Sequence, residues 1–107
     1  MSLSVERAAR NEALFREVNE EVARLERRLE RTDPQFVCEC ASESCVDRVT
    51  VPLKAYEEIR SHPRRFVLKP GHEQTHLERV VETGNGYVVV EKTEVAGRVA
   101  ERTNPRE

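Results

Sequence analysis

The amino-acid sequence predicts an α+β protein, in which a long N-terminal amphipathic helix precedes a small antiparallel β-rich, zinc-stapled domain with short helices. Three observations predict it. Apolar residues recur three and four apart before Pro34, the period changes to two after it, and three cysteines gather within eight residues. The 107 residues suit one domain, but 37% hydrophobic residues and no Trp make a thin core. We therefore expect support from a metal, an oligomer or both.

The helix is predicted over residues 5–30, with Ser4 as its N-cap and Thr32-Asp33-Pro34 as its end. Its outer face carries charges at successive i,i+4 positions, namely Glu12, Arg16, Glu20 and Arg24. Its other face is a narrow coiled-coil-like seam, formed by Ala8, Asn11, Phe15, Val18, Val22, Leu25 and Leu29.

This seam has two interpretations, because it could cover the protein's own sheet or bind a protein partner or a second copy. A parallel dimer would place Glu21 opposite Glu26, so the protein's own sheet or an antiparallel partner is favoured. We expect residues 1–33 to form the helix and residues 34–107 the metal-stapled domain, as a single folding unit.

Short elements separated by turn residues are predicted after Pro34. A strand covers 36–40, a polar loop covers 41–44, and a second strand leads from Cys45 through Val49 and Val51. The rest comprises a helix over 54–61, a strand over 66–68, a hairpin of 77–82 with 87–92, and a last helix that Thr93 begins.

The cysteines form the strongest candidate site. In a strand, Cys38 and Cys40 point the same way while Glu39 points away, and the short loop returns Cys45 to them. Three thiolates favour a structural Zn²⁺, which takes four ligands. His72 is the expected fourth ligand because it follows the turn residues Pro70-Gly71; His76 and His62 are alternatives and Glu73 is a weaker one. Otherwise the cysteines pack as small apolar side chains or form a redox pair.

Residues 72–76 also match H-E-x-x-H, the zinc metallopeptidase motif. That chemistry needs both histidines one turn apart on a helix, with Glu73 as the general base. Pro70-Gly71 would place His72 on a fraying first turn, and no third ligand stands out downstream. We therefore expect no enzyme, with a minimal zinc hydrolase as the alternative.

A basic stretch covers residues 60–69, where Arg60, Arg64, Arg65 and Lys69 occur without an acid among them. These side chains could contact phosphate or nucleic acid. The net charge is −2, however, and Glu57 and Glu58 are near in sequence. An ordinary solvated patch is therefore favoured over a nucleic-acid-associated regulator.

The expected location is the cytoplasm. There is no signal-peptide pattern and no run of ~18 apolar residues, so no membrane contact is expected. An odd number of closely spaced cysteines also suits a reducing compartment.

The segments FVCECASESC, PRRFVLKPGHE and GYVVVEK resemble those of small, uncharacterised bacterial proteins, which share a helical opening like RNEALFREVNE. This resemblance implies no known activity, cofactor or partner. The function expected from the residues is therefore that of a non-catalytic zinc-binding protein, acting as a protein-interaction or regulatory module that self-associates through its helix.

Overall fold

The computed structural model describes residues 5–29, 34–42, 44–74 and 76–106. Its elements in chain order are α1 (Val5–Leu29), β1 (Gln35–Val37), β2 (Arg48–Thr50), α2 (Leu53–Arg60), β3 (Arg65–Leu68), β4 (Glu78–Thr83), β5 (Val88–Lys92) and α3 (Glu94–Arg102). The predicted α+β class, with its long first helix, is confirmed. The expected N-cap at Ser4 and most of the expected helix end at 32–34 lie outside the described residues.

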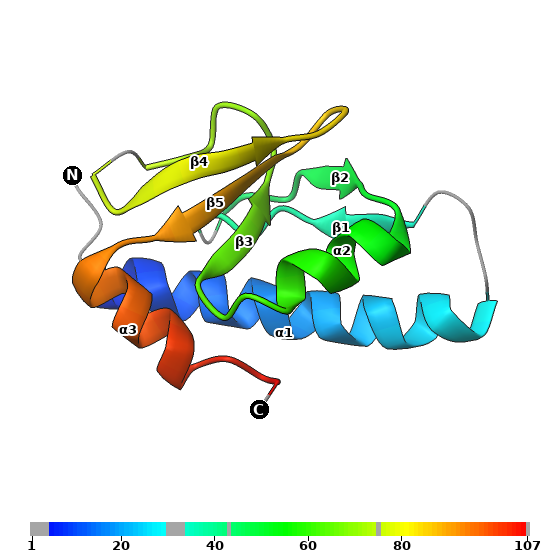
Figure 1. Ribbon diagram of the computed structural model, residues 1–107, viewed down its shortest axis with the longest axis horizontal. Helices are drawn as coiled ribbons and strands as arrows, with labels where there is room; N and C mark the ends of the chain where they lie inside the picture. The colour runs from blue at the N-terminus through cyan, green and yellow to red at the C-terminus, as the bar shows by residue number, and fades with distance from the viewer. Residues whose placement is uncertain (1–4, 30–33, 43, 75, 107) are drawn as a thin grey trace.

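Two small antiparallel sheets lie above α1, as Figure 1 shows. One sheet pairs β1 with β2, and the other has the strand order β3-β5-β4. Just after β1, the amide of Glu39 donates to the carbonyl of Val67 in β3 at 2.9 Å. This bond joins the two sheets at the point where the cysteines begin.

The core consists of two apolar clusters on either side of this junction. In the first, the rings of Phe36 and Tyr56 stack with centroids 4.1 Å apart, against buried valines of β2, β3 and β5. In the second, Cys38 and Cys40 pack with Phe66 and other apolar side chains of β3 and β5. The cysteines therefore lie at the edge of a buried apolar region.

Helix α1 faces the sheets with a different side from the one expected. The buried residues on it are Ala8, Glu12, Arg16, Asn19, Ala23 and Glu26. Val18, Leu25 and Leu29 of the predicted seam are 41%, 48% and 50% exposed, so the seam does not cover the sheets as one stripe. The predicted outer face is also wrong for Glu12 and Arg16, because both are buried under other parts of the chain.

Partners from distant segments explain why polar groups are buried here. Both terminal nitrogens of Arg16 donate to backbone carbonyls, those of Pro63 and Ala100, each at 2.7 Å. The amide group of Asn19 donates to the carbonyl of Val37 at 2.8 Å and accepts from the Val37 N–H at the same distance. Buried polar groups are tolerated when they are hydrogen-bonded. The polar side chains on this face of α1 therefore bind backbone groups of the short strands and loops that cover it.

The later elements agree with the predictions to within a few residues. The hairpin, the helix before Pro63 and the last helix are found, while the first strand ends at Val37, ahead of the cysteines. Thr93 precedes α3, but its hydroxyl donates to the Leu77 carbonyl at 3.1 Å and makes no cap. None of the helices described is both long and apolar enough to span a bilayer.

Candidate metal centre

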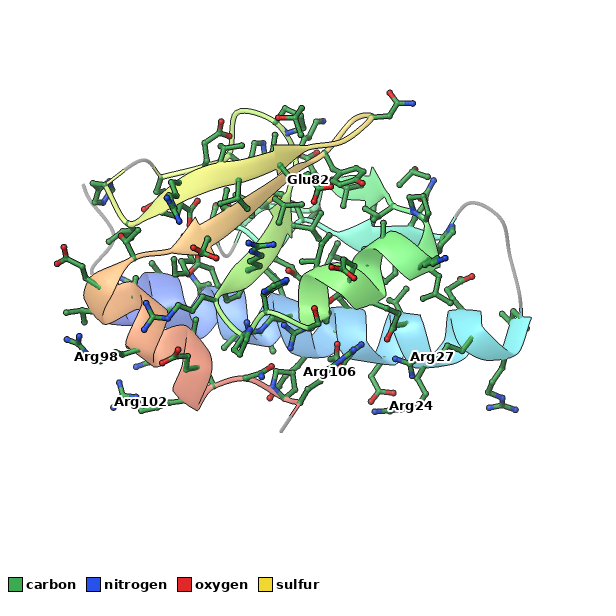
Figure 2. All side chains as sticks on the ribbon, viewed as in Figure 1. Arg24, Arg27, Glu82, Arg98, Arg102 and Arg106 are labelled. Carbon is green, nitrogen blue, oxygen red and sulfur yellow. The ribbon has the colours of Figure 1, made fainter. Side chains whose placement is uncertain are left out.

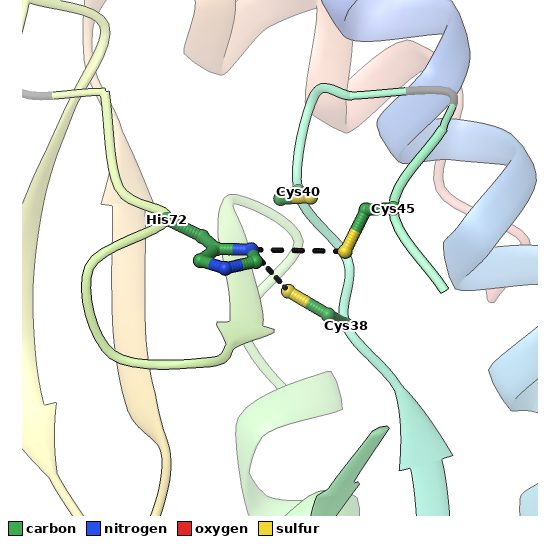
Figure 3. A group of neighbouring side chains, drawn as sticks. All are labelled: Cys38, Cys40, Cys45 and His72. Atoms are coloured by element: carbon green, nitrogen blue, oxygen red, sulfur yellow. Dashed lines mark hydrogen bonds between the residues drawn. The ribbon is translucent and has the colours of Figure 1, made fainter. Parts of the chain in front are cut away.

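Four side chains from two loops converge at the candidate metal centre: Cys38, Cys40, Cys45 and His72 (Figure 3). Their ligand atoms all lie within 4.8 Å of one another. Cys38 and Cys40 are buried, while Cys45 and His72 are partly exposed. The first loop runs from β1 to β2, and the second follows β3.

Alternation along the extended chain positions the first two cysteines, as predicted. The amide of Cys38 continues the β1–β2 ladder by donating to the Asp47 carbonyl at 3.0 Å. The carboxylate of Glu39 points the opposite way and accepts hydrogen bonds from the Tyr56 hydroxyl at 2.7 Å and from the Asn19 side-chain amide at 2.8 Å. The two cysteines are thereby held on the side that faces His72.

A tight turn places His72 beside the cysteines. The amide of His72 donates to the Lys69 carbonyl at 3.1 Å, which closes a four-residue turn through Pro70 and Gly71. Gly71 has a φ of +94°, a conformation that side chains other than glycine rarely adopt. Proline followed by a glycine of positive φ is the pattern of a type II turn. This turn aims the imidazole back at the cysteine loop.

The distances from His72 to two of the sulfurs are close to those around a tetrahedral zinc ion. The Nδ1 atom of His72 lies 3.6 Å from the Cys38 sulfur and 3.7 Å from the Cys45 sulfur. Zn–S and Zn–N bonds of about 2.3 and 2.0 Å at a tetrahedral angle require an S–N separation of about 3.5 Å. His72, Cys38 and Cys45 therefore already stand close to the spacing that zinc needs, and Cys40 lies within 4.8 Å of them.

Backbone N–H groups surround the sulfurs. The amide of Lys69 donates to the Cys38 sulfur at 3.2 Å. The backbone N–H groups of Ser42 and Asp47 act to lower the pKa of Cys40 and of Cys45, respectively. Backbone N–H groups near a sulfur stabilise the negative charge of its thiolate form, and three thiolates would have to share one ion here.

The pKa values of the three cysteines are shifted in different directions, so the three thiols do not ionise equally. The hydrogen bond from the Cys38 thiol is the main cause that lowers the pKa of Cys40 to about 5, and bonds from His72 and the Ser42 amide act in the same direction. The same hydrogen bond, followed by burial, raises the pKa of Cys38. Burial raises the pKa of Cys45. The Cys40 thiol therefore ionises most readily of the three. Three thiolates side by side would repel one another, so a cation is needed to balance their charge.

Asp47 extends the site, although it was not among the predicted site residues. Its Oδ2 atom lies 3.4 Å from Nε2 of His72 and also accepts a hydrogen bond from the Cys45 thiol at 4.0 Å. Metal-binding histidines commonly donate their second N–H to a carboxylate, which fixes the tautomer that binds the metal. Its position two residues after Cys45 was the only signal in the sequence.

The other histidines lie elsewhere. Among the described residues, neither His62 nor His76 belongs to the metal-type group. Residues 72–74 and 76–77 are not helical, and β4 begins at Glu78. The helical geometry that a metallopeptidase motif requires is therefore not found in these residues, and Thr75 lies outside the described residues.

The basic stretch does not form one free patch. Arg60 is buried and binds Glu20 at 3.2 Å, so it is not available to phosphate. The other three side chains each have a carboxylate partner, in the pairs Arg64–Glu101, Arg65–Glu91 and Lys69–Asp47. Nucleic-acid binding through these residues stays a prediction without a shared surface to support it.

No family model, curated protein or solved structure matches this chain. Its function is therefore inferred from the convergence of three cysteines and one histidine.

Proposed function

We propose that this protein is a non-catalytic, zinc-stabilised module in which Cys38, Cys40, Cys45 and His72 hold a structural Zn²⁺. The observation that carries the proposal is the approach of all four ligand atoms to within 4.8 Å of one another. Three sulfurs and one nitrogen suit zinc because it accepts soft thiolates and imidazole in a tetrahedral arrangement.

The donor set favours a structural role over a catalytic one. Four protein ligands complete the tetrahedron, whereas a catalytic zinc keeps one position for water or substrate. Two of the four, Cys38 and Cys40, are buried against the Phe66 cluster. An ion held in this way would stabilise the folded chain.

The stabilising effect follows from where the ligands come from. The cysteine loop belongs to the β1–β2 sheet, and His72 follows a strand of the other sheet. An ion bound by both loops would fasten the two sheets together. Because the unfolded chain lacks a preformed site, the free energy of zinc binding becomes free energy of folding.

An interaction or regulatory role is the second half of the proposal. Its support is the row of apolar side chains that α1 leaves exposed: Leu14, Val18, Leu25 and Leu29. Exposed apolar rows of this kind are typical of surfaces that bind other proteins.

The test is the metal content of protein purified without chelators. We expect one zinc per chain, three thiols that react only after chelation, and a lower unfolding midpoint in denaturant once zinc is removed. His72→Ala should weaken zinc binding strongly, whereas the matched variant His76→Ala should leave it unchanged. Metal-free protein with freely reactive thiols, or equal effects of the two variants, would refute the site.

A further inference from the structure

One row of exposed apolar side chains runs along α1 on the side away from the sheets. Of the seven large apolar side chains that are well exposed in the described part of the chain, four belong to this helix: Leu14, Val18, Leu25 and Leu29. Their exposed fractions are 56%, 41%, 48% and 50%. The row continues for about four turns, because these residues are separated by intervals of four, seven and four.

The N-terminal half of this row contains a hollow. It is open, has a volume of about 370 Å³, and is lined by Pro105 and by six residues of α1: Leu14, Glu17, Val18, Glu20, Glu21 and Arg24. Among these, Leu14, Glu17, Val18 and Glu21 occupy positions i, i+3, i+4 and i+7 of the helix. Four residues at this spacing form the hole that receives one side chain when two helices pack together. The hollow therefore has room for an apolar side chain from another helix.

The row is symmetric about its middle. Positions 14 and 29, and likewise 18 and 25, are equally far from the midpoint between Glu21 and Val22. A two-fold axis at that midpoint would place Leu14 against Leu29 of a second copy, and Val18 against its Leu25. A surface that matches itself about an axis is what an interface between two identical chains requires.

From these observations we propose that α1 forms an antiparallel helix pair with a second copy of this chain, in which Leu25 of each copy occupies the hollow between Leu14 and Val18 of the other. The inference rests on the interaction half of the proposed function and deepens it by naming the partner. It does not depend on how zinc is bound, except that the chain must be folded.

Charge complementarity supports this register. The lining of the hollow includes three acids, Glu17, Glu20 and Glu21, against the single base Arg24, and Leu25 is flanked by Arg24 and by Arg28 one turn further on. Arg24 lies on the side of α1 remote from the sheets (Figure 2). Its present contact with Glu21 joins side chains that are 62% and 71% exposed, so exchange for a carboxylate of the second copy costs little. In a parallel pair, by contrast, one acidic hollow would face the other.

The first experiment measures the mass of zinc-loaded protein by sedimentation or light scattering from low to high micromolar concentration. We expect a concentration-dependent approach to twice the monomer mass. Leu25→Glu should raise the dimer dissociation constant by about 100-fold or more, because the change removes two buried leucines from each dimer and adds two like charges at acidic hollows. Val95→Glu is the matched control, because Val95 is similarly exposed, at 53%, but lies on α3. This control should dimerise normally.

The second experiment tests the antiparallel register. Glu17→Arg with Glu21→Arg should weaken the dimer, and the addition of Arg24→Glu with Arg28→Glu should restore it. Circular dichroism and zinc content of every sample show whether each variant folds and loads, so a failure of the zinc site is seen separately. A monomer at all concentrations, a normal dimer with Leu25→Glu, or no rescue by the charge exchange would each overturn the proposal.

Discussion

At the scale of single residues, Gly71 determines whether the histidine reaches the cysteines. Its φ of +94° closes the turn, and the space where a Cβ would stand is empty within 4 Å. Gly71→Ala therefore costs free energy through the backbone alone, roughly 1 kcal/mol. We also expect weaker zinc binding, because relaxation of the turn would move the His72 ring.

Gly86 provides the matched control for this variant. Its φ is +87°, the space where its Cβ would stand is likewise empty within 4 Å, and it lies in the β4–β5 hairpin. Gly86→Ala should lower the free energy of unfolding by a similar amount without altering zinc affinity. Competition with a chromophoric chelator measures that affinity. Equal zinc affinities for the two variants would contradict the role of the Gly71 turn.

Asp47 is not one of the four candidate ligands, but its carboxylate contacts two of them, His72 and Cys45. Asp47→Asn keeps the shape of the side chain but removes the charge that faces Nε2 of His72 at 3.4 Å. We expect the zinc dissociation constant to rise about 10- to 100-fold, as is typical when such a partner is removed. The same chelator competition measures it, with Glu82→Gln, an exposed acid on β4, as the acid-to-amide control. Unchanged affinity in Asp47→Asn would mean that His72 is oriented by its turn alone.

At the scale of secondary-structure elements, α1 binds the neighbouring strands and loops through hydrogen bonds from buried polar side chains. Asn19 holds both backbone groups of Val37 and one oxygen of Glu39, so it satisfies three groups at the end of β1. Asn19→Leu would make the helix more apolar, yet we expect the free energy of unfolding to fall by roughly 3 kcal/mol or more, because these buried groups lose their partner.

Val18 is the control one position earlier in the same helix. It is 41% exposed, so Val18→Asn should change the free energy of unfolding of the monomer by less than about 0.5 kcal/mol. Urea unfolding at low protein concentration measures both variants. If Val18→Asn were the more destabilising of the two, the buried face of α1 would have been assigned to the wrong side.

At the scale of the whole molecule, a buried charge cluster joins the N-terminal helix to the C-terminal half. The Lys92 ammonium at the end of β5 contacts the carboxylates of Glu12 in α1 and Glu78 in β4, and all three side chains are buried. Burial raises the pKa of Glu12 from 4.5 to about 7, against the opposing effect of Lys92. The folded protein therefore holds this proton more tightly than the unfolded chain does.

The pH dependence follows from that difference. The proton's contribution to stability is complete below about pH 4.5 and is lost as the pH rises through 7. Glu12→Gln keeps a neutral side chain at every pH. The stability of wild type relative to this variant should therefore fall by roughly 3 kcal/mol between pH 4.5 and 8. Urea unfolding at saturating zinc measures it, with Glu17→Gln on the exposed side of α1 as the control. A pH-independent difference for Glu12→Gln would show that Glu12 is ionised throughout.

The order of the elements and the identity of the candidate ligands could be predicted from the amino-acid sequence. A change of hydrophobic period at Pro34, turn residues at 84–86 and alternation at Cys38 and Cys40 are local signals, and local backbone preferences are enough to interpret them. The turn chemistry of Pro70-Gly71 even favoured His72 over the other histidines.

The buried face of α1 and the groups that support the zinc ligands became known only from the folded chain. Hydrophobic periodicity assigns the apolar side of a helix to the core, but here Arg16 and Asn19 face inward because their hydrogen-bond partners lie on segments 18 to 84 residues away. The contact of Asp47 with the His72 ring likewise became known only from the folded structure. The pairing of a buried polar group depends on the fold of the whole chain, so no local pattern in the sequence could reveal it.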